Sequence, residues 1–425
     1  MIAFLLSLLV PVIIPVGQID LQPHRIVILL SMPFLLGRLF TGKVGKVTKI
    51  VYLVLFGGLW CALAYTLSYP YSSKGGGVMG TAQFAFSFFF ELYGGFLIAR
   101  VGIRNGRDLR RVTLFMFFCT MAALPLAAIE AFTHKAFLME LLGRKPAFDT
   151  RFGMRRAQVV FGHPILYGAF VSSAVGLVWY TYRVNAILGG RILRSILIFF
   201  ALFFSLSMGA ILSFMVQSGS IIYENSFKKI EKRWTLLIIG IIAMYFVVDL
   251  IAKSNLFSIL VRYMTFNHQT SYIRVLTFQY GMDIIYARLF FGFGSARWTR
   301  PPGFPSSMDN FWLLTAMQFG LPAFFVLATA TALIMRRLAL KSLSDPLDIS
   351  CRAAVLTAMG GIVLAGGTVH YWQNMLSFVM FMFGSGIWLL SRPDAPSEDD
   401  DAPPDQEAGS ETSVKKRFVP YGREA

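Results

Sequence analysis

Long apolar segments separated by short polar loops make up most of the chain. Most of these segments are about 18 to 25 residues long, enough for a helix to cross a hydrocarbon core about 30 Å thick. Backbone groups in lipid must be paired within their own segment, and the alternating pattern of barrel strands does not occur, so helices are expected. The pattern predicts an all-α polytopic membrane bundle of about twelve transmembrane helices, at 1–16, 26–41, 49–69, 78–100, 111–133, 163–183, 192–208, 210–223, 234–252, 310–335, 353–370 and 372–391.

Two parts of this pattern allow more than one interpretation. The segments 192–208 and 210–223 share a short turn, so a re-entrant pair is the alternative to two full spans. The first segment has no basic region before it, and Pro11 and Pro15 interrupt it without a small-residue cleavage pattern. We therefore expect a first span there and not a cleaved signal peptide.

Composition supports a membrane protein. Hydrophobic residues make up 56% of the chain and charged residues 14%, against about 25% charged residues in an ordinary soluble domain. These values exclude a soluble globular enzyme. The cysteines Cys61, Cys119 and Cys351 lie in or beside apolar segments without paired spacing, so neither a disulfide framework nor a thiolate metal site is expected.

Basic residues indicate the orientation, because cytoplasmic loops of membrane proteins are enriched in Lys and Arg. They mark every second short loop, in clusters around 38–49, 100–111, 183–194, 228–233 and 336–352. Both termini are then expected in the cytoplasm. After the membrane domain 1–392, residues 393–425 are rich in Pro, Asp, Glu and Ser, with nine acidic and four basic residues. This composition predicts a disordered cytoplasmic tail.

Two loops on the opposite, extracytoplasmic side are long and rich in arginine. They span 134–162 and, between the ninth and tenth spans, 253–309. Their basic residues include Arg144, Lys145, Arg151, Arg155, Arg156, Arg262, Arg274, Arg288, Arg297 and Arg300. The five histidines, His24, His134, His163, His268 and His370, fall on the same side in this topology. A single arginine there is explained by snorkelling to headgroups, but the cluster favours an anionic, phosphorylated ligand that guanidinium groups bind bidentately.

Three motifs lie in or beside these loops. The first runs from Arg155 to Ile165 and leads into the sixth span through His163 and Pro164. The second begins at Ser271 and reaches, after Arg274, the Gly-Phe-Gly of 292–294; the third is Asp309-Asn310-Phe311-Trp312-Leu313-Leu314, followed by Gly320-Leu321-Pro322. In order and spacing they resemble the O-antigen ligase and O-antigen polymerase family from about Arg151 to Arg337, and exopolysaccharide polymerases among its members.

The chain also departs from that family pattern. Asp309 stands where the family often has His before Asn310, Met208 where an Arg is expected, and Leu289, beside Arg288, where Pro is usual. The base is therefore open among Asp309, His163 and His370. An aspartate among guanidinium groups should stay ionised, so Asp309 is expected to orient the acceptor hydroxyl or an arginine, and His163 to accept the proton.

The resemblance implies a glycosyltransferase-type enzyme of the bacterial inner membrane. It would transfer a glycan from a polyprenyl-pyrophosphate carrier to an acceptor sugar hydroxyl, with the lipid pyrophosphate as leaving group, in O-antigen or exopolysaccharide biosynthesis. The expected catalytic residues are His163 and Asp309, the expected pyrophosphate-binding residues Arg155, Arg156, Arg274 and Arg288, and further candidates His370, Arg297 and Asn310.

The same resemblance implies the expected partners. They are the lipid-linked donor glycan, the acceptor glycan, membrane lipid and proteins of polysaccharide export or chain-length control. Fixed guanidinium groups can stabilise a departing pyrophosphate, and no D-x-D motif or metal-spaced cluster occurs in the outer loops, so no metal or cofactor is expected. No nucleic-acid partner is expected, because topology explains the basic cytoplasmic loops.

The sequence also allows two other functions. A twelve-span transporter or flippase of lipid-linked oligosaccharide fits the span count and the intramembrane acid Glu91, although the two halves of the chain do not look alike. A structural subunit of an export complex would not need clustered outer arginines. Polymerase and ligase differ only in the acceptor, and the missing His before Asn310 slightly favours the polymerase.

Overall fold

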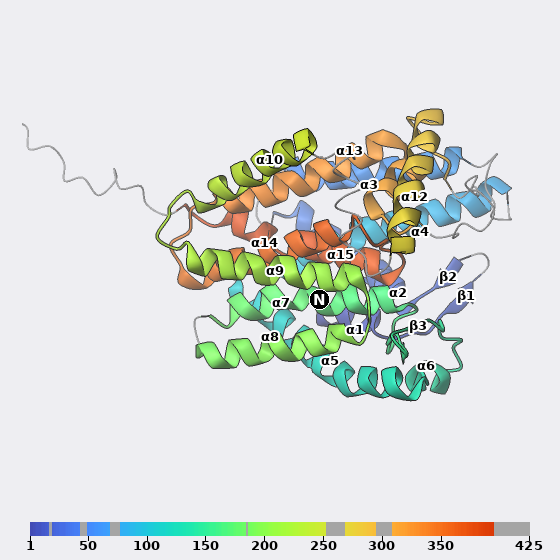
Figure 1. Cartoon of the computed structure of the whole chain (residues 1–425). Helices are drawn as coiled ribbons and strands as arrows, with labels where there is room; N and C mark the ends of the chain where they lie inside the picture. The colour runs from blue at the N-terminus through green and yellow to red at the C-terminus, as the bar shows by residue number, and fades with distance from the viewer. Residues whose placement is uncertain are drawn as a thin grey trace, which may run out of the picture.

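The computed structural model describes residues 1–16, 19–42, 49–68, 77–183, 186–251, 268–294 and 308–394 (Figure 1). Its helices are α1 Ile2–Leu8, α2 Pro23–Phe40, α3 Lys49–Leu67, α4 Gly77–Gly102, α5 Gly106–Thr133, α6 Phe137–Leu141, α7 Pro164–Thr181, α8 Leu188–Phe203, α9 Met208–Ser226, α10 Arg233–Ile251, α12 His268–Ala287, α13 Phe311–Leu340, α14 Pro346–Ala365 and α15 Asn374–Gly384, with a 3-10 turn at Ile387–Ser391. Two antiparallel pairs of short strands complete it: β1 Ile14–Val16 with β2 Ile19–Leu21, and β3 Thr150–Arg151 with β4 Met154–Arg155. The tail beyond 394 and parts of the second outer loop, including Arg297, lie outside the described residues.

Over the described residues the chain is an all-α polytopic membrane protein, as expected. Eight helices among them are long and apolar enough to cross a bilayer: α2, α3, α4, α5, α7, α13, α14 and the stretch Asn374–Ser391 that contains α15. Helix α10 has a shorter apolar stretch, Arg233–Val247. Helix α12 occupies part of the segment expected as the second outer loop.

The expectation of a first span over 1–16 is wrong. Helix α1 ends at Leu8, and the chain then continues into β1, which pairs with β2. Pro11 and Pro15 account for this, because proline lacks the backbone N–H that a continuing helix would use. The N-terminal segment therefore forms a short helix and a β-hairpin in place of a transmembrane helix.

Helix α7 lies at the centre of the bundle. It is packed against α5, α8, α9 and α14, and nearly all of its residues are buried. The segments expected as seventh and eighth spans form two separate helices, α8 and α9, which both pack on α7. At 16 residues α8 is too short to qualify as a span by length. The turn between α8 and α9 returns the chain to the end of the bundle where α7 begins.

A second group of helices packs beside this centre. Helix α4 contacts α2, α3 and α15, and α3 contacts α13. Two glycines permit the close approach of α4 and α15: a Cβ at Gly95 would overlap the main-chain oxygen of Ser377, and one at Gly384 that of Phe96. Small residues at such contacts let transmembrane helices pack backbone to backbone.

Candidate functional site

The β3–β4 hairpin lies at the end of the bundle where α7 begins, and we call this end the site end (Figure 1). Its two-residue turn is Phe152-Gly153, and both residues have positive φ, 53° and 74°. Such a turn matches the twist of paired strands, although Phe is a strained choice for its first position. The hairpin places Arg151, Arg155 and the following Arg156 on this end of the bundle.

Arg155 mainly anchors the hairpin. Its side chain is 3% exposed and donates from Nη1 to the oxygen of His134 at 2.6 Å and from Nη2 to that of Ala147 at 3.2 Å. The guanidinium also lies over the Phe148 ring, 5.2 Å from its centroid. Its Nε is buried without a hydrogen-bond partner. Both terminal nitrogens of the Arg155 guanidinium therefore bond to main-chain oxygens of the protein itself.

Arg156 and Arg151 both contact the turn between α8 and α9. Arg156, 4% exposed, donates from Nε to the oxygen of Ser205 at 3.1 Å and from Nη1 to Asp149 Oδ2 at 2.6 Å. Arg151 donates from Nη1 to the oxygen of Leu206 at 2.8 Å. Leu206 itself has φ 46°, a conformation that costs a non-glycine residue energy and that clusters at functional sites. The hairpin and the helical turn thus fix each other.

Arg274, on α12, brings a third guanidinium to the same place. Its Nη2 reaches the oxygen of Thr368 at 3.5 Å, and its Nη1 is buried with no partner in the described part of the chain. Burial lowers the pKa of Arg274, and the nearby Asp309 opposes this shift. Burial together with Arg156 lowers the pKa of Arg151, while Asp149 and Asp309 raise it. We call Arg151, Arg156 and Arg274 the arginine group.

His163 caps the N-terminus of α7 beside this group. Its Nδ1 accepts a hydrogen bond from the Ile165 amide at 3.2 Å. Burial and the positive charge of Arg156 lower the pKa of His163, with Asp309 and Asp149 opposing them, so the ring is neutral at neutral pH. Because Nδ1 uses its lone pair, the proton of this neutral ring is on Nε2. In this conformation Nε2 of His163 can donate a hydrogen bond, whereas a proton acceptor at Nε2 would need the other tautomer.

Asp309 and Asn310 stand at the start of α13. Asn310 Oδ1 accepts from the Leu313 amide at 3.0 Å and so caps that helix. The Phe311 amide donates to the oxygens of Gly366 and Val369, which ties α13 to the loop after α14. Asn310 is therefore a positioning residue for Asp309, the carboxylate that acts electrostatically on Arg151, Arg274 and His163.

His370 lies in the loop between α14 and α15. Its ring stacks on Trp372 with centroids 5.5 Å apart, and on Phe311 with centroids 6.5 Å apart. Its Nδ1 is buried without a partner, and burial lowers the pKa of His370 to about 4. His370 is thus a neutral imidazole held between aromatic rings.

The Gly-x-Gly of the second motif completes a kink in α13. Pro322 has no N–H for the oxygen of Gln318, and the Leu321 amide turns to the oxygen of Leu289 at 2.7 Å, which frees the oxygen of Met317. These two freed oxygens accept from the amides of Gly294 at 3.0 Å and Phe293 at 2.9 Å. The motif is therefore a structural clasp between the end of α12 and the kink, and it fixes α12, which carries Arg274.

Arg288 lies just after α12, where its main-chain oxygen accepts from the Gly292 amide at 3.2 Å, within the same clasp. The structure therefore brings Arg156, Arg274, His163, Asp309, Asn310 and His370 to the site end, with Arg155 in a supporting position. Asp149 and Trp372 belong to this set and were not predicted. Their one sequence signal is proximity in the chain to Arg151 and His370. Among the described residues, no group of three or more His, Cys, Asp or Glu side chains is placed to hold a metal ion.

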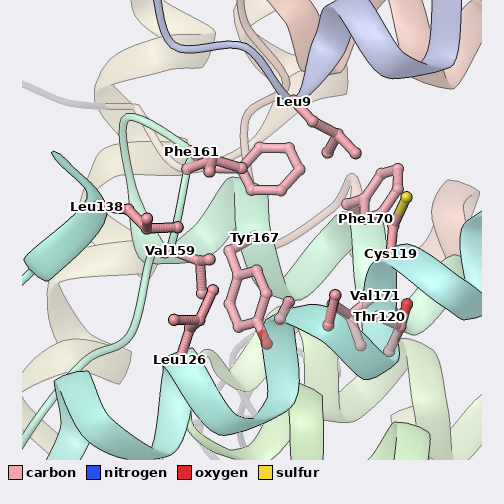
Figure 2. A pocket seen from close by; sticks show the side chains of 13 residues that line it. Leu9, Cys119, Thr120, Leu126, Leu138, Val159, Phe161, Tyr167, Phe170 and Val171 are labelled. Carbon is pink, nitrogen blue, oxygen red and sulfur yellow. The ribbon is translucent and has the colours of Figure 1, made fainter. Parts of the chain in front are cut away.

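An apolar pocket lies at the segment Val159–Phe161, which follows Arg156 in the chain (Figure 2). Its volume is about 180 Å³, and its lining comes from α1, α5, α6, α7 and the segment Val159–Phe161. That segment joins Arg156 to His163. It is held by Glu130 of α5, whose Oε2 accepts from the amides of Gln158 at 2.8 Å and Val159 at 3.0 Å, with Val159 at φ 54°. The pocket wall and the charged site are thus parts of one strained segment.

Comparison with known proteins adds no family: no family model matches the chain, and no curated protein matches it.

Proposed function

We propose that the protein transfers a glycan from a polyprenyl-pyrophosphate carrier to a sugar hydroxyl. The observation that carries this proposal is the arginine group, three guanidinium groups with His163 and Asp309 beside them, linked by the segment Val159–Phe161 to an apolar pocket. A pyrophosphate on a lipid chain combines the two chemistries that this arrangement would bind. The motif resemblance supports the same proposal.

The acceptor oxygen attacks the anomeric carbon while the bond from that carbon to the pyrophosphate oxygen breaks. The bonding electron pair leaves with the pyrophosphate, where negative charge grows. Arg156 and Arg274 stabilise this charge, and Arg151 adds to the positive potential, because fixed donors aimed at developing charge lower the barrier. Arg274 is the residue most ready for this role, since its Nη1 has no hydrogen-bond partner among the described residues.

The acceptor proton goes to Asp309 in this proposal. His163, with its proton on Nε2, donates a hydrogen bond to a phosphate or sugar oxygen. Asn310 and the clasp hold Asp309 and Arg274 in position. This assignment exchanges the roles that the sequence suggested for His163 and Asp309, and the tautomer at His163 is the reason.

The apolar pocket would hold the first part of the carrier chain. A cavity of 150 Å³ lined by apolar groups stays dry and binds benzene, and this pocket, at about 180 Å³, has room for a hydrocarbon group of similar size. Its wall at Val159–Phe161 places such a group next to Arg156.

The test uses purified protein in proteoliposomes with a short oligosaccharide on polyprenyl pyrophosphate. The proposal predicts release of polyprenyl pyrophosphate together with lengthened glycan; a ladder of products indicates a polymerase, and a single transfer to a different acceptor a ligase. Arg274→Gln should abolish release, while Arg107→Gln, an exposed arginine near the start of α5, should not. Movement of the lipid-linked glycan across the bilayer without release would contradict the proposal and support a flippase.

A further inference from the structure

A groove with a lining that is almost entirely apolar lies between α7, α8 and α9, toward the end of the bundle opposite the site end. Its volume is about 400 Å³, and its lining includes Trp179, Ile192, Ile196, Phe199, Phe214 and Ile221. Leu193 and Phe200 on α8 and Ile222 on α9, at or beside the groove, are apolar and exposed. This outer face is therefore suited to hydrocarbon, and the groove is a depression within it.

Polar atoms without hydrogen-bond partners lie at the groove. Trp179 and Ser195 both line it, and Trp179 Nε1 and Ser195 Oγ are buried with no partner among the described residues. The same holds for Nη1 of Arg194, which precedes Ser195 in the chain. The Trp179 residue is only 9% exposed. Buried donors left unpaired are costly, so their gathering at one place points to an occupant with acceptor oxygens.

Positive charge is concentrated at the same place. Arg191, 9% exposed, lies over the Trp179 ring at 4.1 Å and donates from Nε to the main-chain oxygen of Trp179 at 3.1 Å. Arg194 lies over the Tyr182 ring at 4.6 Å, and Arg110 lies over the same ring at 5.1 Å.

Little negative charge balances these arginines. Arg183 repels Arg191, and the carboxylate that acts on both is Glu224, which already pairs with Arg183 at 3.5 Å and accepts from the Tyr180 hydroxyl. Among the described residues, the guanidinium groups near Trp179 and Tyr182 thus outnumber the carboxylate that contacts them.

We infer that this groove is a binding site for an anionic phospholipid, with one acyl chain along the apolar lining and the phosphate at Arg191 and Arg194. The ester and phosphate oxygens would pair with the unpartnered donors. Basic pockets between membrane helices bind anionic headgroups on the cytoplasmic side, where the distribution of basic loops places this end of the chain. The inference is independent of glycan transfer, because the groove lies toward the C-terminal end of α7 and the arginine group at its N-terminal end.

The experiment measures retained lipid by native mass spectrometry of the full-length protein, released from micelles that contain equal amounts of phosphatidylglycerol and phosphatidylcholine. We expect phosphatidylglycerol to be retained preferentially. Each arginine near such a headgroup is worth about fivefold in affinity, so the Arg191→Gln/Arg194→Gln double variant should lose most of the preference. Arg107→Gln is the matched control and should keep it.

Two further measurements distinguish a site that binds an acyl chain from simple electrostatic attraction of a phosphate group. Ser218→Phe fills the groove from α9, where Ser218 lines it, and should reduce phosphatidylglycerol retention with both arginines intact. Glycerol 3-phosphate, which has the headgroup charge without the chains, should neither bind nor raise the melting temperature. Three outcomes would each overturn the inference: equal retention of the two lipids, an unchanged preference in the double variant, or full retention in Ser218→Phe. Melting temperatures in phosphatidylcholine alone show whether the variants are folded.

Discussion

The rings of His163 and Trp372 form a T-shaped pair with centroids 5.5 Å apart. The other neighbour of Trp372 is His370, so one indole holds two neutral imidazoles at the site end. The two histidines differ in one respect: His163 has its Nδ1 paired, whereas the Nδ1 of His370 has no partner. Because of this difference, variants of His163 and of His370 test two different roles.

Replacing Arg156 or Arg274 by Lys keeps the charge but removes the planar fork of donors. At Arg156 one ammonium cannot serve both Ser205 and Asp149 as the guanidinium does, and at Arg274 the free Nη1 is lost. We expect the rate of pyrophosphate release to fall by about 10- to 100-fold in each variant with membrane levels of protein unchanged. Initial rates in proteoliposomes measure this, with Arg107→Lys as control; full activity of both variants would mean that these arginines do not bind the donor.

His163→Asn separates capping and donation from base catalysis. Asn is a favoured N-cap, so its Oδ1 can replace Nδ1 at the Ile165 amide while its Nδ2 still donates, but it cannot accept a proton. We expect this variant to keep activity within about tenfold of the wild type, and His163→Ala to lose about 1 kcal/mol of stability as well as activity. A dead but stable His163→Asn enzyme would return the role of base to His163.

Protonation of His370 should destabilise the protein in mild acid. The folded state holds the pKa of His370 at about 4, below the value near 6.5 of an unfolded chain, so the unfolded state binds the proton first as the pH falls. Stability is then lost between about pH 6.5 and 4, by about 3 kcal/mol at most. Melting temperature against pH should be flatter over this range for His370→Gln than for the wild type, and equal slopes would contradict the assignment.

The clasp at the α13 kink should depend on its glycines. Gly292, Gly294 and Gly320 have φ of 64°, 59° and 80°, and a Cβ at Gly294 would overlap Ser68. Alanine at any of the three should cost about 1 to 3 kcal/mol or more and should displace α12. Gly360→Ala, a helical position with open space around it, is the control and should be neutral. Thermal melting together with activity reports both effects.

Filling the apolar pocket should affect donors with long lipid chains more than donors with short ones. Ala123 lines the pocket, so Ala123→Leu would occupy part of its 180 Å³. We expect kcat/KM to fall several-fold for a long polyprenyl donor and to change little for a donor with one isoprene unit. Ala128→Leu, on α5 but outside the pocket lining, is the control. An equal loss with both donors would place the chain elsewhere.

Much of the helical layout follows from hydropathy, because a helix that crosses lipid must be apolar over its whole length. The first span failed since hydropathy does not register the absent N–H groups of Pro11 and Pro15. The motif order also pointed to residues that the fold brings together, such as Arg156 and Asp309, which are distant in the chain.

Other features depend on contacts that no local pattern carries. The role of Phe293 and Gly294 depends on oxygens freed at the kink of the next helix, and the tautomer of His163 depends on a backbone amide. In the sequence, Trp372 is one apolar residue among many, and only the fold places it between two histidines. The charged residues of the site are therefore visible in the sequence, whereas the neutral residues that position them depend on contacts made by the fold.

The clasp also bears on how α13 enters the bilayer during synthesis. A helix with two unpaired carbonyl oxygens at its kink would be costly to insert alone. Their partners, the amides of Phe293 and Gly294, lie on the N-terminal side of the kink and leave the ribosome before it. The segment that completes the helix is thus already synthesised when the kink emerges, and the pair can enter the membrane as one unit.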